Sequence, residues 1–172
     1  LNNELKGQPV SDIPKDTLIK MYVKMVIIRK FEEKVAEILR APTKEITTPC
    51  HLYIGQEAIA TGVCSALRKD DWVFSTHRSH GHFIAKGGNI NALMAELYCK
   101  KTGCSRGKGG SMHIASPDMG LPGSSAIVAG TIPISVGAAL AFSMQHRDSV
   151  SVAFFGDGAS QEGVFYEALN FA

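Results

Sequence analysis

Short runs of β-branched and aromatic residues alternate with longer helical patterns along this chain of 172 residues. The strand-like runs cover residues 71–76 and 149–155. Apolar residues at helical spacing predict helices at about residues 14–40, 55–67, 91–98, 131–144 and 161–172. Strands that alternate with helices are typical of an α/β fold, in which helices flank a parallel sheet. We therefore expect such a domain over residues 13–172, after a polar lead-in at residues 1–12.

Two of the predicted helices carry more detailed expectations. The first begins after Ser11-Asp12, which can cap free N–H groups, and Pro14 suits its first turn. Its expected apolar face consists of Leu18, Tyr22, Met25, Ile28, Val35 and Leu39. The helix at residues 131–144 is small and apolar, so we expect it to be buried. Its close packing is predicted to run through Gly137, Ala138, Ala139 and Ala141.

Charge and hydropathy exclude several classes of partner. The chain has 18 basic and 16 acidic residues, a formal net charge of +2, so no concentrated basic surface indicates binding to nucleic acid. No apolar stretch approaches the roughly 20 residues of a membrane-spanning helix. The polar amino-terminal residues do not resemble a signal peptide. These features favour a cytoplasmic protein, or one of the mitochondrial matrix in a eukaryote.

The strongest chemical pattern is a strand that runs directly into Gly156-Asp157-Gly158 and then into a helix. Ligands of α/β sheets bind at the carboxyl ends of strands, and glycine lets the backbone approach a phosphate closely. An aspartate repels a phosphate unless it holds a divalent cation such as Mg²⁺, which prefers oxygen ligands. The pattern thus indicates a metal–phosphate site. A simple tight turn is the alternative.

A second pattern, at residues 76–82, follows the first strand. Arg78 can bind a phosphate through two parallel hydrogen bonds, and the histidines can bind phosphate or transfer protons. His80 and His82 could also ligate zinc, although no carboxylate or cysteine joins them at a useful spacing. An exposed polar loop after a strand is the remaining alternative.

Two further segments are weaker signals by themselves. His51 lies before the second predicted helix, where a structural histidine is the default interpretation. The glycine-rich segment 103–123 contains Arg106 and Lys108, and a mobile surface loop is the default for such a composition.

The four patterns occur in an order that is specific. They read H-L-Y-x-G-Q-E-A at residues 51–58, T-H-R-x-H-G-H at 76–82, R-G-K-G-G-S-M-H at 106–113 and G-D-G-A-x-x-x-G-x-x-x-E-x-L-N at 156–170. From about Asp16 to Ala172, the chain resembles the amino-terminal portion of the alpha subunit of the thiamine-diphosphate-dependent 2-oxo acid dehydrogenase family. That family includes the pyruvate, branched-chain 2-oxo acid and acetoin dehydrogenases.

The resemblance implies a thiamine-diphosphate-binding fold and a role for each matching residue. Asp157 would ligate magnesium, while Gly158 and Ala159 would contact the diphosphate. Arg78 and His77 would bind diphosphate oxygens. His51 would handle substrate protons at the entrance, and His80 is the second candidate for proton transfer. Residues Ala126 and Val128 match backbone positions around the aminopyrimidine ring.

The resemblance also implies partners and an activity. A beta subunit would complete the site in an α2β2 heterotetramer, which would cleave pyruvate, a related 2-oxo acid or acetoin and pass the acyl group to a lipoyl-bearing acyltransferase. The family's second metal ligand, an asparagine, and its later histidine loop have no match before Ala172. We therefore expect a truncated domain, incomplete at its carboxyl end. A non-catalytic truncated paralogue that binds a beta subunit is the alternative, and a transketolase-type enzyme is a third possibility.

Overall fold

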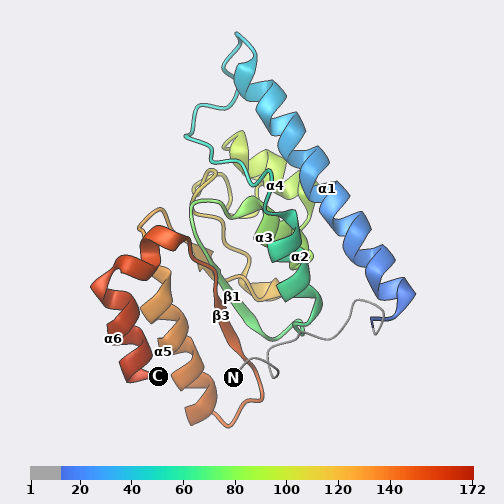
Figure 1. Cartoon of the computed structure of the whole chain (residues 1–172). Coiled ribbons are helices and arrows are strands. Elements are labelled where there is room, and N and C mark those ends of the chain that lie inside the picture. Colours follow the sequence, from blue (N-terminus) through green and yellow to red (C-terminus); the bar gives the residue numbers. More distant parts are fainter. Residues whose placement is uncertain (1–12) are drawn as a thin grey trace.

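The computed structural model describes residues 13–172, and its elements alternate between helix and strand (Figure 1). The strands are β1 (Trp72–Ser75), β2 (Gly123–Ser124) and β3 (Ser151–Ala153). The α-helices are α1 (Lys15–Arg40), α2 (Glu57–Ser65), α3 (His80–Ala85), α4 (Ile90–Leu97), α5 (Thr131–Met144) and α6 (Gly163–Phe171). Two short 3-10 helices are η2 (Pro117–Met119) and η3 (Asp157–Gln161). No helix of residues 13–172 has the length and apolar character needed to cross a membrane.

The sheet has the strand order β2-β1-β3, and both pairings are parallel. Phe74 pairs with Gly123 on one side and with Ala153 on the other. Helices α1, α2 and α3 lie on one side of the sheet, and α5 packs against β1 and β3 on the other. The predicted α/β fold, with helices flanking a parallel sheet, is confirmed.

Helix α1 begins after Pro14, as expected, and its apolar face is narrower than predicted. Ile28 and Val35 are fully buried, whereas Tyr22 and Leu39 are 65% and 37% exposed. The buried face is completed by Phe31, Glu32 and Ala36. The predicted cap at Ser11-Asp12 lies outside the described residues. The most deeply buried residues of α1 thus lie in its carboxyl-terminal half.

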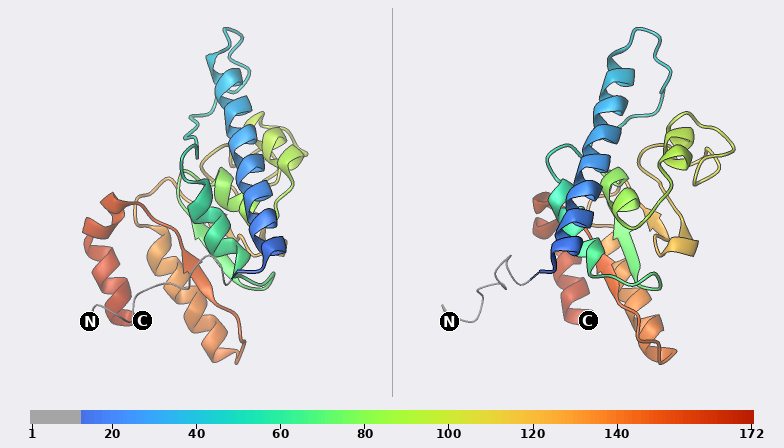
Figure 2. Two further views of the ribbon diagram at one scale, coloured as in Figure 1. Left: turned by 45° about the vertical axis from the view of Figure 1, so that its right-hand side comes forward. Right: turned by 90° about the vertical axis from the view of Figure 1, so that its right-hand side faces the viewer.

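Helices α5 and α6 pack against each other, and Figure 2 shows them side by side, apart from α1. Together with Ala129 and Ala159 they form a second, small apolar core. The expectation that α5 is buried is wrong within this chain, because Ile134, Leu140 and Met144 are exposed. A Cβ atom on Gly137 would meet nothing within 4 Å, so the predicted close packing at this glycine is also absent from the described residues.

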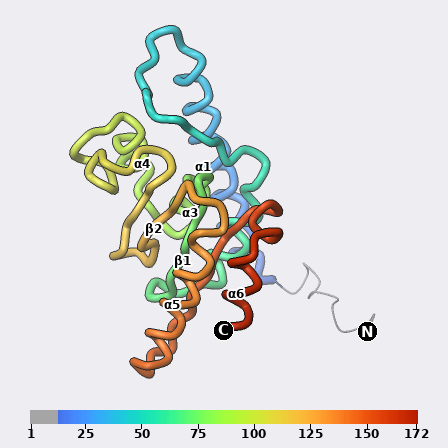
Figure 3. Tube along the Cα trace, turned by 90° about the vertical axis from the view of Figure 1, so that its left-hand side faces the viewer, coloured from blue at the N-terminus to red at the C-terminus, as the bar shows by residue number. Residues whose placement is uncertain are grey.

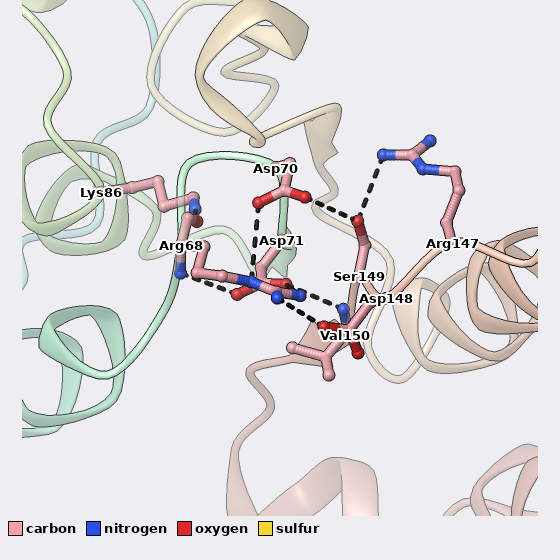
Figure 4. A network of polar contacts seen from close by, with 8 residues as sticks. All are labelled: Arg68, Asp70, Asp71, Lys86, Arg147, Asp148, Ser149 and Val150. Carbon is pink, nitrogen blue, oxygen red and sulfur yellow. Dashed lines mark hydrogen bonds and ion pairs between the residues drawn. The ribbon is translucent and has the colours of Figure 1, made fainter.

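A network of charged groups joins the starts of β1 and β3 (Figure 4). The buried carboxylate of Asp71 accepts hydrogen bonds from the backbone N–H of Val150 at 2.9 Å and that of Arg68 at 2.7 Å. The Arg68 guanidinium binds Asp71 and also Asp148, which precedes β3. Burial opposes the charge of Asp71, but these hydrogen bonds outweigh it and lower the pKa of the carboxyl group. The network thus holds the amino-terminal ends of β1 and β3 together, in the register in which Trp72 pairs with Ser151.

Candidate functional site

A cavity of about 340 Å³ lies at the carboxyl ends of β1 and β3. Because these strands are parallel, the segments that follow them meet at one edge of the sheet. The cavity is lined by Tyr53, Gln56, Ile59, Thr76, His77, Arg78, His82, Phe154, Phe155, Gly156 and Asp157. Two patterns that are far apart in the sequence, residues 76–82 and 156–158, thus contribute to the same cavity.

Arg78 is held at this cavity by the segment before α2. Its Nη1 donates a hydrogen bond to the carbonyl oxygen of Leu52 at 2.6 Å, and its backbone N–H donates to Thr76 Oγ1 at 3.2 Å. The guanidinium remains half-buried, and the hydrogen bond to Leu52 uses only one of its five N–H groups. The arrangement suits the recognition of an anion by the remaining N–H groups.

His77 and His51 face each other beside Arg78. Their ring centroids are 4.8 Å apart, and the rings are inclined by 75°. Burial, His51 and Arg78 all lower the pKa of His77, so its imidazole is neutral at pH 7. His51 Nδ1 is buried and has no hydrogen-bond partner within the described residues. The pair can therefore accept protons or bind a polar ligand group.

Asp157 begins η3, directly after the last residues of the β3 segment. Asp157 is exposed and lines the cavity, while Ala159 is buried and donates its N–H to the carbonyl oxygen of Gly156 at 3.1 Å. The predicted turn at Gly156-Asp157-Gly158 is thus the start of a 3-10 helix. Within the described residues, no cluster of three histidine, cysteine or carboxylate side chains could hold a metal. Asp157 is the one carboxylate among the residues that line the cavity.

His80 does not line the cavity. It begins α3 and is fully buried, with Nδ1 2.8 Å from Glu32 Oε1 and Nε2 2.9 Å from Ser111 Oγ. These contacts connect α1, α3 and the glycine-rich segment. Proton transfer by His80 stays a prediction. The zinc alternative is wrong, because the nitrogens of His80 and His82 bind different groups in separate parts of the core.

Ala126 and Val128 lie between β2 and α5. Ala126 is half-buried, and Val128 is exposed. Neither is among the residues that line the cavity. Their expected contacts with an aminopyrimidine ring remain predictions.

The glycine-rich segment is tied to the protein by Glu96 at the end of α4, and Figure 3 traces this part of the chain from α4 to β2. Glu96 is fully buried, and its carboxylate accepts hydrogen bonds from the N–H groups of Ser105, Gly107, Gly109 and Gly110 at 2.8–3.2 Å. Interpreting this segment as a loop with few contacts is therefore wrong. Its amides bind an internal carboxylate, so they are not free to bind a phosphate.

Several cavity residues were not predicted from the sequence. Tyr53, His82 and Phe154 form the inner wall, and the His82 ring contacts the rings of both other residues. His82 belongs to the pattern at residues 76–82, for which an exposed polar loop was one alternative and no helix was predicted. The signal that could have found it is the apolar Phe83-Ile84-Ala85 directly after it, which extends a short helix.

The chain is similar to known proteins over almost its whole length. The family described as dehydrogenase E1 component matches residues 23–172. The chain is 46% identical over 168 residues to the alpha subunit of acetoin:2,6-dichlorophenolindophenol oxidoreductase from Bacillus subtilis, covering 98% of this chain and 50% of the relative. It is 39% identical over 169 residues to the alpha subunit of the pyruvate dehydrogenase E1 component from Rhizobium meliloti, covering 98% and 48%.

A mitochondrial relative shows the same pattern. The alpha subunit of the Saccharomyces cerevisiae pyruvate dehydrogenase E1 component is 40% identical over 158 residues, covering 92% of this chain and 37% of the relative. The chain thus spans about half the length, or less, of these curated relatives. The family match includes every strand and all four sequence patterns. The chain belongs to the dehydrogenase E1 component family.

Proposed function

We propose that residues 13–172 form the diphosphate- and metal-binding side of a thiamine-diphosphate-dependent E1 alpha subunit. The observation that carries this proposal is the meeting of Arg78 and His77, after β1, with Asp157, after β3, at one cavity. Membership of the E1 family implies thiamine diphosphate as the cofactor. Magnesium is our inference from the chemistry of the residues present.

The cavity suits an anionic group with a bound cation. Arg78 supplies a positive charge and directed N–H donors. Asp157 alone would oppose a diphosphate, and it becomes favourable when it holds Mg²⁺ that also binds the phosphate oxygens. Magnesium commonly takes one or two carboxylates together with phosphate oxygens, which fits a site with a single carboxylate. Phe154, Phe155 and Ile59 supply the apolar part of the cavity lining.

Each predicted residue then has a definite task. Asp157 holds the metal, and the backbone of Gly158 and Ala159 contacts the diphosphate. Arg78 and His77 bind diphosphate oxygens. Ala126 and Val128 contact the aminopyrimidine ring. His51 and His80 transfer protons. When bound, thiamine diphosphate supplies the nucleophile and electron sink for cleaving a carbon–carbon bond beside a carbonyl.

The wider activity follows from relatives that are named for acetoin and pyruvate. We propose that the protein acts on acetoin, pyruvate or a related 2-oxo acid and passes the acyl group to a lipoyl-bearing acyltransferase. A beta subunit would complete the site in an α2β2 heterotetramer. A non-catalytic role as a binding partner of a beta subunit is the alternative, because the chain spans about half of its relatives.

Calorimetric titration tests this proposal. The full-length protein, with and without a co-expressed beta subunit, should bind thiamine diphosphate only when Mg²⁺ is present. Asp157→Asn should abolish magnesium-dependent binding of thiamine diphosphate without unfolding the domain, because the side chain is exposed. Asp118→Asn is the matched control, since Asp118 is an exposed aspartate on η2 and does not line the cavity. Wild-type affinity in Asp157→Asn would overturn the assignment. Binding without turnover in the complex would favour the non-catalytic alternative.

A further inference from the structure

His82 is the residue that connects all three segments of the cavity. It lies in α3 and is almost fully buried. Its Nδ1 is 2.6 Å from Ser75 Oγ, at the end of β1, and its Nε2 is 2.9 Å from the hydroxyl of Tyr53. Its ring stacks on Phe154 after β3, with centroids 3.8 Å apart and an angle of 20°. One side chain therefore contacts segments 51–53, 75–78 and 154–157.

The same segments carry the groups assigned to the ligand. Ser75 is followed directly by Thr76, His77 and Arg78. Tyr53 is preceded by Leu52, whose carbonyl oxygen binds Arg78, and by His51, whose ring contacts His77. Two sets of contacts therefore hold segments 51–53 and 75–78 together. The contacts of Arg78 and His77 lie at the cavity surface, and the hydrogen bonds of His82 lie beneath it.

The bonds of His82 are those of a neutral imidazole. Burial lowers the pKa of His82 to about 3, so one ring nitrogen donates and the other accepts at neutral pH. Both hydroxyl partners can donate or accept, so either tautomer satisfies the chain Ser75–His82–Tyr53. Gly81 permits the arrangement, because a Cβ atom there would lie 2.1 Å from the Tyr53 ring.

We propose that His82 is a positioning residue of this site, which holds Arg78 and His77 in the geometry that binds the diphosphate. It acts through its hydrogen bonds to Ser75 and Tyr53. This inference rests on the proposed function of the cavity. It differs from a purely structural role, which would change the stability of the fold and leave ligand affinity unaltered.

Substitutions at His82 separate its two hydrogen bonds. In His82→Asn the amide replaces Nδ1 and keeps the bond to Ser75, and in His82→Gln it replaces Nε2 and keeps the bond to Tyr53. His82→Leu removes both. Magnesium-dependent affinity for thiamine diphosphate, measured by calorimetry on the full-length protein with its beta subunit, should fall by roughly fivefold for each bond lost. The variants His82→Asn and His82→Gln, which each keep one hydrogen bond, should therefore bind thiamine diphosphate more tightly than His82→Leu.

Two controls separate positioning from stability. Leu93→Ala removes a fully buried side chain of α4 that does not line the cavity, so it should lower the melting temperature and leave the affinity unchanged. Tyr53→Phe should weaken binding about as much as His82→Asn. Its matched control is Tyr98→Phe, which removes an exposed hydroxyl bonded to Glu45 and should bind as the wild type does.

A measurement without cofactor keeps the inference testable if the proposed function fails. Carbon-13 NMR of the histidine rings reports the pKa of His77, which burial, His51 and Arg78 lower. In His82→Leu this pKa should rise toward its ordinary value, because His77 loses its position beside those groups. Wild-type protein that binds no thiamine diphosphate would reject the function only. An unchanged His77 pKa, or wild-type affinity in folded His82→Leu, would reject the positioning role.

Discussion

Oε2 of Glu96 lies 2.8 Å from the backbone nitrogen of Gly107. Three further N–H groups of the glycine-rich segment bind the same carboxylate, and no lysine or arginine among the described residues forms an ion pair with it. Backbone amides therefore replace a cationic partner in compensating a buried charge. This relationship explains how a segment rich in glycine has a defined structure.

Glu96→Gln should loosen residues 103–113. An amide presents one oxygen and an NH₂ group, which would face the N–H donors of Gly109 and Gly110 or of Ser105 and Gly107. Losing charge-assisted hydrogen bonds should cost about 1.5–3 kcal/mol of unfolding free energy. Hydrogen-exchange mass spectrometry should show faster exchange across the segment. Glu37→Gln, at an exposed position on α1, is the control and should exchange as the wild type does.

Arg78→Lys should weaken the binding of thiamine diphosphate by roughly 1–3 kcal/mol, although the charge is retained. Lysine lacks the planar set of donors that can bind Leu52 and an anion together. The affinity is measured by titration in the presence of Mg²⁺. Arg106→Lys, on the exposed part of the glycine-rich segment, should have no effect. Equal affinity in both variants would show that Arg78 does not bind the diphosphate.

Asp71→Asn should destabilise the pairing of β1 with β3 by about 1.5–3 kcal/mol at pH 7, because two backbone N–H groups and Arg68 lose a charged acceptor. The folded pKa of Asp71 is lowered, so its contribution is present above the unfolded value of about 3.9 and disappears as the pH falls through the folded pKa. Urea unfolding should therefore show a large difference at pH 7 that shrinks in acid. The exposed Asp70→Asn should change little.

The stability of the protein should begin to fall as the pH drops below about 6.5, before most carboxylates are protonated. The folded pKa of His82 is about 3, so between these values the unfolded chain binds the extra proton and unfolding is favoured. Above pH 6.5 the contribution is complete. Unfolding free energies measured from pH 7 to 4.5 should have a smaller slope in His82→Leu. The same slope in both proteins would mean that His82 is not buried as a neutral group.

Local sequence patterns were sufficient to predict most of the elements. Residues 131–144 form α5 with the expected bounds, because a run of small and apolar residues of this length can be recognised without reference to distant contacts. The parallel sheet followed from the alternation of strands and helices. The lining of the cavity by Arg78 and Asp157 followed from the rule that parallel strands present their carboxyl ends at one edge.

Features that depend on distant contacts were not predicted. The histidines of α3 look like a polar loop until Glu32, Ser111 and Tyr53 supply buried partners from other parts of the chain. Glu96 looks like an ordinary exposed residue of an amphipathic helix, since nothing near it in sequence shows that four amides will surround it. The exposed side of α5 was missed for the same reason, because apolar composition alone does not reveal which neighbours cover it.

The two apolar cores have a consequence for cooperativity. Tyr53 and Phe83 belong to the larger core, Ala159 and Ala168 to the smaller one, and the neighbouring residues Ala153 and Phe154 touch one core each. A small core such as the one between α5 and α6 can unfold locally while the rest of a protein stays folded. If α5, η3 and α6 open together, Asp157 leaves Arg78 while the larger core stays folded. A ligand bound to both Asp157 and Arg78 would then couple the unfolding of the two cores, so that two thermal transitions become one.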